Sequence, residues 1–410
     1  EALDHYHLLS RVLPEWDAVR NRPQRNAYHR FTVDRHLLEA AARAATGAAT
    51  GAATGAVEPG VTTVARPDLL LVGTLLHDIG KGFPGDHTEV GMEVMDRVAR
   101  RMGYDDADVA TLVAMVRHHL LLPDAATRRD LDDPVTVDTV ARAVGDVDTL
   151  HLLAALTEAD SLATGPAAWG PWKAGLVADL VRRVEAHLRG DSVPAAPSSP
   201  ITDRHRQLMV QAKRLGRTVV WAEAPTLTVV ARDRPGLLAA VTGVLALRGL
   251  DVRAADVAGE DQFAVEIFAV EPSRGRWPDW HLVGDEIDAV LRGTLPLEAR
   301  LAEQARLYAG GRRPVTARPV TSGVQIDNDA SASSTVVEVH AADAVGLLHR
   351  VTTALFDQHL DVTAARVSTF GHEVVDAFYV RDGATGGKVQ DLEHLRRISD
   401  AVAEAIDRVG

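Results

Sequence analysis

The chain has 410 residues, 46% of them apolar, and contains no cysteine. This length is enough for two or three domains with separate cores. A formal net charge of −13 argues against nucleic acid as the main partner, because phosphate binding needs clustered Lys and Arg. Without cysteine, any metal must bind to His, Asp or Glu. No apolar run is long enough to cross a membrane, and the first residues form no signal peptide, so we expect a cytoplasmic protein.

Residues 1–190 are predicted to be mostly helical. Apolar residues recur every three or four positions in "TVDRHLLEAAARAA", "DVATLVAMVRHHLLL" and "DTLHLLAALTEADSLATG", which is the spacing of amphipathic helices. The tandem tetrapeptide "AATGAATGAATG", residues 44–55, contains Gly and Thr, which weaken a helix. We expect it to be a loop insertion. The start lacks Met and runs straight into helical periodicity, so the natural chain is expected to extend upstream.

Potential metal ligands occur together in this helical region. "LLHDIGKG" places His77 and Asp78 side by side after an apolar run, where polar groups would cost burial free energy without a role. Imidazoles and carboxylates from separate helices can converge on one or two divalent cations. A single histidine on a helix is more often structural, so the prediction rests on the whole set. The candidates, in chain order, are His36, His77, Asp78, His87, His118, His119 and Asp160.

Lys81 follows three residues after Asp78 and is one of four lysines in a chain with 40 arginines. Arginine is therefore the usual cation of this sequence, and a lysine at this place is noteworthy. A compact ammonium group could hold a substrate phosphate. Alternatively, Lys81 is a solvated charge at the end of a helix. Both interpretations stay open from the sequence.

An internal repeat follows the proline-rich stretch "GDSVPAAPSSP", residues 190–200, which predicts a domain boundary. "DRPGLLAAVTGVLALRGLDVRAADV" (233–257) and "DAVGLLHRVTTALFDQHLDVTAARV" (343–367) are identical at 13 of 25 positions, with a constant offset of 110. Each copy predicts a strand, a turn, an amphipathic helix, two more strands and a second helix. This βαββα pattern predicts an antiparallel sheet with helices on one face.

The shared turn "D-x-x-G-L-L" is a candidate ligand site in each copy. Its glycine permits a tight turn into a helix, whose N-terminal N–H groups can bind a small carboxylate. The aspartate could accept from an α-ammonium group, so a free amino acid would fit. Alternatively, the aspartate only caps the helix and the glycine only makes the turn. The candidate ligand-binding residues are Asp233, Gly236, Leu237, Leu238, Asp343, Gly346, Leu347 and Leu348.

Both regions resemble known families. The tandem D-x-x-G-L-L units resemble ACT domains, which bind amino acids at paired interfaces, although the second copy has "DAVG" where the first has "DRPG". The order of His and Asp residues, with "LLHDIGKG", resembles the HD phosphohydrolases. That resemblance implies phosphoester hydrolysis. It assigns the four core metal ligands to His36, His77, Asp78 and Asp160, and the positions for a second metal to His87, His118 and His119. The candidate catalytic residues are Asp78, Lys81 and His118.

Together, the two regions resemble the C-terminal part of the bifunctional uridylyltransferase/uridylyl-removing enzymes of bacterial nitrogen regulation. The implied fold is multidomain, with an all-α HD domain followed by two α+β ACT domains of the βαββαβ ferredoxin-like type. The expected limits are 1–190 for the HD domain, 191–225 for a linker, 226–300 for the first ACT domain, 301–334 for a second linker and 335–410 for the second ACT domain.

The resemblance also implies a reaction and partners. The expected activity is removal of a nucleotidyl group, UMP or AMP, from a tyrosine of the PII signal protein, with Mg²⁺ or Mn²⁺ in the HD domain. Glutamine bound to the ACT domains is expected to favour removal. No nucleotidyl transfer is expected, because the chain has no Gly-Ser dipeptide and the family's transferase domain needs one before its paired aspartates. Two alternatives are an HD hydrolase of a small nucleotide and a non-catalytic glutamine-sensing adaptor that binds PII.

Overall fold

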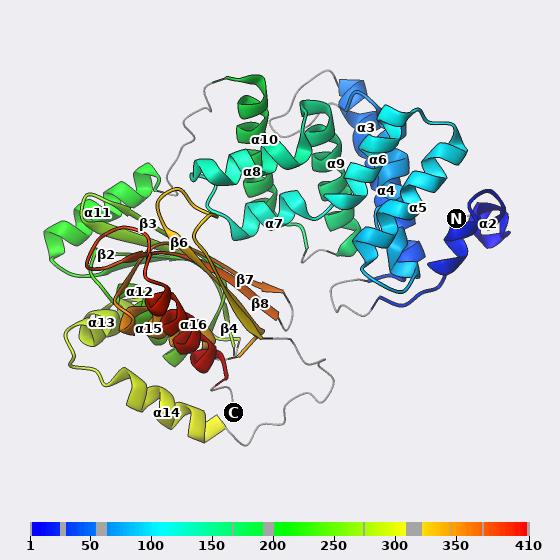
Figure 1. Cartoon of the computed structure of the whole chain (residues 1–410). Coiled ribbons are helices and arrows are strands. Elements are labelled where there is room, and N and C mark those ends of the chain that lie inside the picture. The colour runs from blue at the N-terminus through cyan, green and yellow to red at the C-terminus, as the bar shows by residue number, and fades with distance from the viewer. Residues whose placement is uncertain are drawn as a thin grey trace. The chain divides into compact units, whose positions relative to one another are not determined.

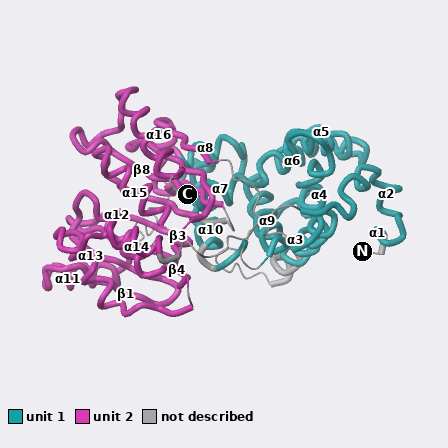
Figure 2. The backbone as a smooth tube through the Cα atoms, turned by 90° about the horizontal axis from the view of Figure 1, so that it is seen from below, with its two compact units in different colours: residues 1–127, 136–194 teal, residues 128–135, 195–410 magenta. Residues whose placement is uncertain are grey.

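The computed structural model describes residues 2–24, 30–54, 64–165, 168–191, 201–273, 275–308, 322–344, 346–370 and 373–407. The chain divides into two compact units (Figure 2). The first comprises residues 1–127 and 136–194, and the second comprises residues 128–135 and 195–410. No described helix is both long enough and apolar enough to cross a membrane.

The first unit is helical, as its apolar periodicity predicts (Figure 1). Helix α3 packs against α4 and α9, and α5 packs against α6. Leu37, Leu70, Met115 and Leu156 are among the fully buried residues of the core between them. The helices are α1 (Ala2–His5), α2 (Leu8–Val12), η1 (Pro14–Ala18), α3 (Val33–Thr54), α4 (Pro67–Leu76), η2 (Ile79–Gly82), α5 (His87–Met102), α6 (Asp106–Arg117), α7 (Leu121–Arg128), α8 (Pro134–Val144), α9 (Val147–Thr164) and α10 (Pro171–Arg189).

The tandem tetrapeptide at residues 44–55 is not a loop over its described part, which corrects the prediction. Helix α3 continues through it as far as Thr54. Half of the residues in the repeat are alanine. Alanine has the highest helix propensity, so its contribution outweighs the cost of the Gly and Thr residues once the preceding turns have formed.

The second unit contains an antiparallel sheet of eight strands in the order β1-β2-β4-β3-β7-β8-β6-β5. Its strands are β1 (Val219–Glu223), β2 (Thr226–Arg232), β3 (Leu250–Glu260), β4 (Phe263–Pro272), β5 (Gly323–Asp327), β6 (Thr335–Ala342), β7 (Leu360–Phe370) and β8 (Glu373–Asp382). Its helices are α11 (Asp203–Leu215), α12 (Leu237–Leu247), α13 (Trp280–Leu291), α14 (Leu297–Tyr308), α15 (Leu347–Asp357) and α16 (Leu392–Asp407).

Helices cover apolar residues on both faces of the sheet. Helices α12, α13, α15 and α16 pack on one face, over a core that includes Phe268 and Phe378 (Figure 1). Helix α11 packs on the other face, where Leu208 and Met209 cover Val265. Side chains of a strand alternate between faces, so Val265 faces α11 while its neighbour Glu266 shares the face of Phe268. This places the Glu266 carboxyl under the helices.

The predicted class, all-α followed by α+β, is confirmed. The position of the fourth strand in each copy differs from the expected βαββαβ order. Strands β1 and β5 precede the copies and pair with β2 and β6 at the two edges of the sheet, which gives a ββαββα order. Both strands have only five residues, and they lie in segments that the sequence predicts to be linkers. Their short patterns carry too little alternation to predict a strand.

The two repeat copies join through equivalent elements at the centre of the sheet. Strand β3 pairs with β7, with Ala255 opposite Val367. Helix α12 packs beside α15, and the hydroxyls of Thr242 and Thr352 lie 3.0 Å apart. These two threonines are 110 residues apart, which is the offset of the sequence repeat. The copies are therefore related by an approximate twofold arrangement within one chain.

Residues 128–135 belong to the second unit, although the chain before and after them belongs to the first. The carboxylate of Asp133 accepts hydrogen bonds from the backbone N–H of Ala332, at 2.9 and 3.1 Å, and from the hydroxyl of Ser331. The guanidinium of Arg366 on β7 lies 3.4 Å from the carboxylate of Asp130. These polar contacts explain why this short segment groups with the sheet.

Candidate metal centre and ligand cavities

His77 and Asp78 occupy the junction between α4 and η2. Both side chains are buried. The Nδ1 atom of His77 lies 2.8 Å from the carbonyl oxygen of Thr74, one turn earlier on α4. Since a carbonyl oxygen only accepts, Nδ1 carries a proton and donates, and Nε2 faces the carboxylates of Asp78 and Asp160. Once Nε2 gives up its own proton, the ring is the tautomer that a histidine needs to bind a metal through Nε2.

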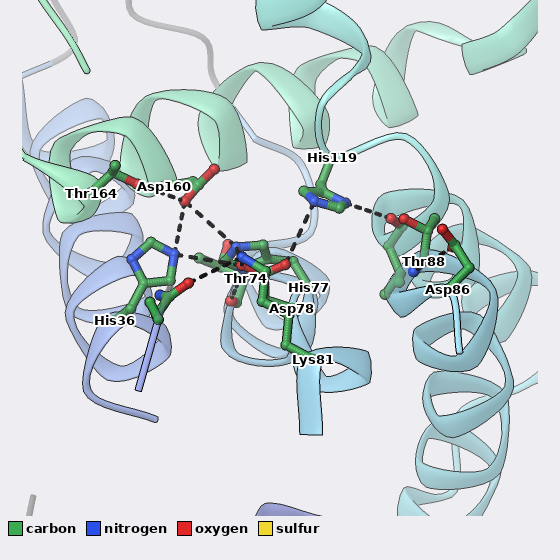
Figure 3. A network of polar contacts seen from close by, with 12 residues as sticks. His36, Thr74, His77, Asp78, Lys81, Asp86, Thr88, His119, Asp160 and Thr164 are labelled. Carbon is green, nitrogen blue, oxygen red and sulfur yellow. Dashed lines mark hydrogen bonds and ion pairs between the residues drawn. The ribbon is translucent and has the colours of Figure 1, made fainter. Parts of the chain in front are cut away.

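His36 on α3 and Asp160 on α9 complete one side of the cluster (Figure 3). The Nε2 atom of His36 lies 2.9 Å from Oδ1 of Asp160 and 3.9 Å from Oδ2 of Asp78. The Nε2 atom of His77 lies 3.6 Å from the same Oδ1 of Asp160. Three helices that are distant in sequence thus bring two imidazoles and two carboxylates to one point.

His119 and His87 lie on the other side of Asp78. The Nδ1 atom of His119 is 2.7 Å from the carbonyl oxygen of Val116, so its Nε2 atom also faces the cluster, 3.7 Å from Oδ1 of Asp78. His87 is the first residue of α5, and its ring centroid is 6.0 Å from that of His119. The same arrangement as at His77, with Nδ1 held by a backbone carbonyl, therefore recurs at His119.

Two groups of potential ligands share Asp78. Ligand atoms of His36, His77 and Asp78 all lie within 4.8 Å of one another, and so do those of Asp78, His87 and His119. Nε2 of His77 and Oδ1 of Asp78 are buried and make no hydrogen bond with the described residues. Buried polar atoms without partners cost free energy, which a bound cation would offset. The donor set, imidazole nitrogens with carboxylate oxygens, fits a divalent transition metal or Mg²⁺.

Gly80 lets η2 approach α5 closely. A Cβ atom at this position would lie 1.8 Å from the carbonyl oxygen of His87 and 2.7 Å from the backbone nitrogen of Gly91. These neighbours are backbone atoms, which cannot rotate away as a side chain would. The absence of a side chain at Gly80 therefore allows the turn after Asp78 to lie against the start of α5, beside His87.

The electrostatics of the cluster favour a cation. Burial lowers the pKa of His77, but the carboxylates of Asp78 and Asp160 outweigh burial and raise this pKa to about 10. Burial would raise the pKa of Asp78, but His77 and Lys81 hold it well below its usual range. The pKa of Asp160 is likewise lowered against burial, by His36 and His77. The carboxylates stay charged, and a divalent cation would replace the proton on His77.

Lys81 points back at the cluster from η2. Its Nζ atom lies 2.5 Å from Oδ2 of Asp78 and 3.3 Å from Oε1 of Gln24. The side chain is 28% exposed whereas that of Asp78 is 3% exposed. The ammonium group is therefore at the boundary between the buried ligands and solvent, and it is not a simple solvated charge.

His118 is placed differently from the other candidates. It ends α6 and is half-buried, and it belongs to neither ligand group formed by the described residues. Burial and the neighbouring Arg117 lower its pKa. Consecutive residues at a helix end point in different directions, so of the two adjacent histidines only His119 points toward Asp78. The sequence alone cannot distinguish the two histidines, and the predicted role of His118 stays a prediction.

The two D-x-x-G-L-L turns line two cavities in the sheet unit. The first cavity, of about 270 Å³, is lined by Asp233, Gly236, Leu237 and Leu238. The second, of about 50 Å³, is lined by Asp343, Gly346, Leu347 and Leu348. Gly236 and Gly346 have φ of 79° and 75°, in the left-handed region that favours glycine. All eight predicted residues thus lie at a cavity, and their binding role stays a prediction.

Each cavity is also lined by a buried acid that the motif does not contain. Glu266 on β4 lines the first cavity and Asp376 on β8 lines the second. Burial, with the nearby carboxyls of Asp233 and Asp343, raises the pKa of each acid to about 8. The two acids are 110 residues apart. A charged residue at the same place in two apolar strands, "FAVEIFAV" and "EVVDAFYV", is the sequence signal that could have found them.

Comparison with known proteins matches the helical unit, with its His and Asp cluster, and the sheet unit, with its two cavities, to two different domain families. The HD domain family matches residues 33–165, and the ACT domain family matches residues 226–274 and 335–400. This chain carries an HD domain followed by two ACT domains. It is 42% identical, over 93% of its length, to the bifunctional uridylyltransferase/uridylyl-removing enzyme of Streptomyces coelicolor. Identity is 39% over 93% of the chain for the Mycobacterium tuberculosis enzyme of the same name, and 32% over 97% for that of Rhodospirillum rubrum.

The chain spans about half the length of these relatives, covering 50%, 47% and 48% of them. The predicted resemblance to the HD and ACT part of this family is confirmed. The HD domain, together with the sequence identity to uridylyl-removing enzymes, supports a hydrolase activity for this chain.

Proposed function

We propose that the HD domain of this chain is a metal-dependent phosphodiesterase that removes a nucleotidyl group, UMP or AMP, from a tyrosine of the PII signal protein. We further propose that glutamine, bound by the ACT domains, favours this removal. The observation that carries the proposal is the pair of ligand groups sharing Asp78. Relatives that share nearly the whole chain are named as uridylyl-removing enzymes, which supports the choice of a nucleotidyl group.

In this proposal, His36, His77, Asp78 and Asp160 hold one cation, and Asp78, His87 and His119 hold a second. A divalent cation such as Mg²⁺ or Mn²⁺ supplies Lewis-acid activation of water and of the phosphoryl group. Hydrolysis forms a bond from the water oxygen to phosphorus and breaks the bond from phosphorus to the tyrosine oxygen. The products are a nucleoside monophosphate and a free tyrosine, whose oxygen regains a proton.

The residues of the chain orient and balance charge in this site. The carbonyls of Thr74 and Val116 fix the rings of His77 and His119 with Nε2 toward the centre. Lys81 lies between Asp78 and solvent, where its ammonium group can contact the phosphate of an incoming substrate. A positive charge there would offset the negative charge of the phosphodiester as it leaves water.

The first test is release of nucleotide from nucleotidylated PII protein, in parallel preparations carrying UMP or AMP, with Mn²⁺ present and with or without glutamine. The wild-type chain is compared with Asp78→Ala, which removes the carboxylate shared by both ligand groups. We expect release that rises with glutamine and falls at least about 100-fold in the variant, as is typical for loss of a central catalytic group.

The other outcomes distinguish the alternatives. Release of phosphate or nucleotide from a small nucleotide, with none from PII, would contradict the proposed substrate and favour a small-nucleotide hydrolase. If the chain binds PII but releases no nucleotide, and Mn²⁺ does not change its melting temperature, the non-catalytic adaptor would be favoured. Activity of Asp78→Ala equal to wild type would contradict the proposed site.

A further inference from the structure

The two ACT cavities differ, although their elements are related by the repeat. In the second cavity, Asp343 already lies 3.4 Å from the guanidinium of Arg253. The residue equivalent to Arg253 in the first cavity is Thr363, which has no charge. The first cavity is also larger, about 270 Å³ against about 50 Å³. Arg381 also lines the first cavity, but among the described residues Asp233 makes no ion pair with it or with another cation. The first cavity therefore has both the space and an acid available for a ligand.

Glu266 is the buried acid of the first cavity, and one of its oxygens lacks a hydrogen-bond partner among the described residues. Its side chain is 1% exposed, and its Oε2 atom makes no hydrogen bond with the described residues. The equivalent Asp376 is one methylene shorter, and its Oδ1 atom accepts from the backbone N–H of Ser368 at 3.2 Å, while its Oδ2 atom makes no hydrogen bond with the described residues. A buried carboxyl without a partner costs the fold free energy, so its presence needs a reason other than stability.

The other polar groups of the first cavity suggest which part of a ligand reaches Glu266. Asp233 precedes the left-handed Gly236 at the start of α12, where helix N–H groups can bind an α-carboxylate and Asp233 an α-ammonium. Glu266 lies deeper, on β4 beneath α12, and its burial, together with the charge of Asp233, raises its pKa and keeps its carboxyl protonated near neutral pH. A protonated carboxyl donates one hydrogen bond and accepts another, and a carboxamide does the same.

We propose that the first cavity is the amino-acid site of the ACT pair and that Glu266 selects a ligand whose side chain ends in a carboxamide. The carboxyl O–H donates to the carboxamide oxygen, and the carboxyl oxygen accepts from the carboxamide N–H. A side-chain carboxylate offers no N–H donor, and it adds a negative charge near that of Asp233. This inference rests on the proposed sensing of an amino acid, and it assigns the side chain that distinguishes glutamine from glutamate.

The test is isothermal titration of the full 410-residue chain, without metal or PII, with L-glutamine, L-glutamate and glutaramate, which lacks the α-amino group. These binding measurements do not depend on hydrolysis, so failure of the phosphodiesterase proposal would leave their outcome intact. The wild type is expected to bind one glutamine per chain, at least about tenfold more tightly than glutamate, because a site built for hydrogen bonds rejects a ligand that lacks them.

Two substitutions at Glu266 and one control at Asp376 give the residue-level test. Glu266→Leu is expected to weaken glutamine binding at least about tenfold. Its melting temperature is expected to equal or exceed that of wild type, because a buried acid without a partner has been removed. Glu266→Gln keeps an uncharged donor and acceptor at this position, so it is expected to retain most of the affinity for glutamine and the preference over glutamate. Asp376→Asn is expected to bind glutamine with wild-type affinity and stoichiometry.

Several results would overturn the inference. Two equal sites per chain, or loss of binding in Asp376→Asn with retention in Glu266→Leu, would move the site to the second cavity. An equal loss of glutamine and glutamate affinity in Glu266→Gln, with glutaramate unaffected, would mean that Glu266 binds the α-ammonium group. A wild-type chain that binds no glutamine would contradict the carboxamide assignment.

Discussion

At the scale of single residues, Asp78 is the one residue that belongs to both groups of potential metal ligands among the described residues. Its two carboxylate oxygens face different neighbours: Oδ2 faces His36, His77 and Lys81, and Oδ1 faces His119. A carboxylate that bridges two sets of imidazoles can hold two cations a short distance apart, an arrangement used by hydrolytic two-metal sites. Each histidine serves one set, so single substitutions can separate the two sets.

Replacing one histidine from the "HH" pair tests the geometry directly. His119→Ala is expected to lose about one of two bound Mn²⁺ ions per chain, because its Nε2 atom faces Asp78. His118→Ala is expected to keep both ions, since His118 belongs to neither ligand group. Metal content after dialysis, measured by mass spectrometry, checks both expectations. Loss of metal from His118→Ala with full retention in His119→Ala would contradict the described site.

At the scale of elements, the contact between η2 and α5 depends on one missing side chain. Gly80→Ala would place a methyl group against the backbone of His87, and the turn carrying Asp78 would have to move away from α5. We expect a loss of about 1–3 kcal/mol in the free energy of unfolding, which is the usual cost of overpacking. We also expect weaker Mn²⁺ binding. Denaturant unfolding and metal titration measure these effects.

The matched control for this substitution is Gly47→Ala on α3. A Cβ atom at Gly47 meets nothing within 4 Å. Because alanine is the better helix former, this variant is expected to gain up to about 1 kcal/mol and to bind Mn²⁺ as the wild type does. If Gly80→Ala behaved like Gly47→Ala, the close approach of η2 to α5 would not exist in solution.

The buried acids of β4 and β8 predict how stability depends on pH. Burial raises the folded pKa values of Glu266 and Asp376 to about 8, from ordinary values of 4.5 and 3.8. Between roughly pH 5 and 8 the folded chain holds protons that the unfolded chain has released, so the free energy of unfolding falls as pH rises. The slope is about 1 kcal/mol per pH unit for each acid.

Unfolding of ligand-free Glu266→Gln/Asp376→Asn, followed across this pH window, is expected to show a shallower decline than the wild type. The reason is that an amide does not titrate, so each substitution removes the contribution of one carboxyl to the change of unfolding free energy with pH. Parallel curves for the two proteins would show that these carboxyls are not buried as described.

At the scale of the whole molecule, part of the architecture is predictable from the sequence. The 110-residue repeat predicted two similar α+β copies in the second unit. The spacing of apolar residues predicted that the first unit is helical. Sequence could not predict that the two copies share one sheet, because the pairing of β3 with β7 joins residues more than 100 positions apart. The candidate ligand set was predictable from residue types and order, whereas the absence of His118 from both groups of described ligands and the burial of Glu266 depend on side-chain directions that only packing fixes.

Because both cavities are built within one chain, affinity for an amino acid should not depend on protein concentration. Titrations of the wild-type chain with glutamine at about 5 and about 100 μM protein are expected to give the same dissociation constant. A site formed between two separate chains would instead bind more tightly as association proceeds. A dissociation constant that falls with protein concentration would show that a second chain contributes to the site.

The approximate twofold arrangement within one chain has a consequence for how the cavities can change over evolution. In a homodimer, one codon specifies both copies of a site, so every substitution appears twice. Here the equivalent positions are encoded separately, and they have diverged: Glu266 against Asp376, Thr363 against Arg253, and Phe356 against Ala246. One cavity can therefore be kept open while the other is filled, with each half of the sheet under its own selection.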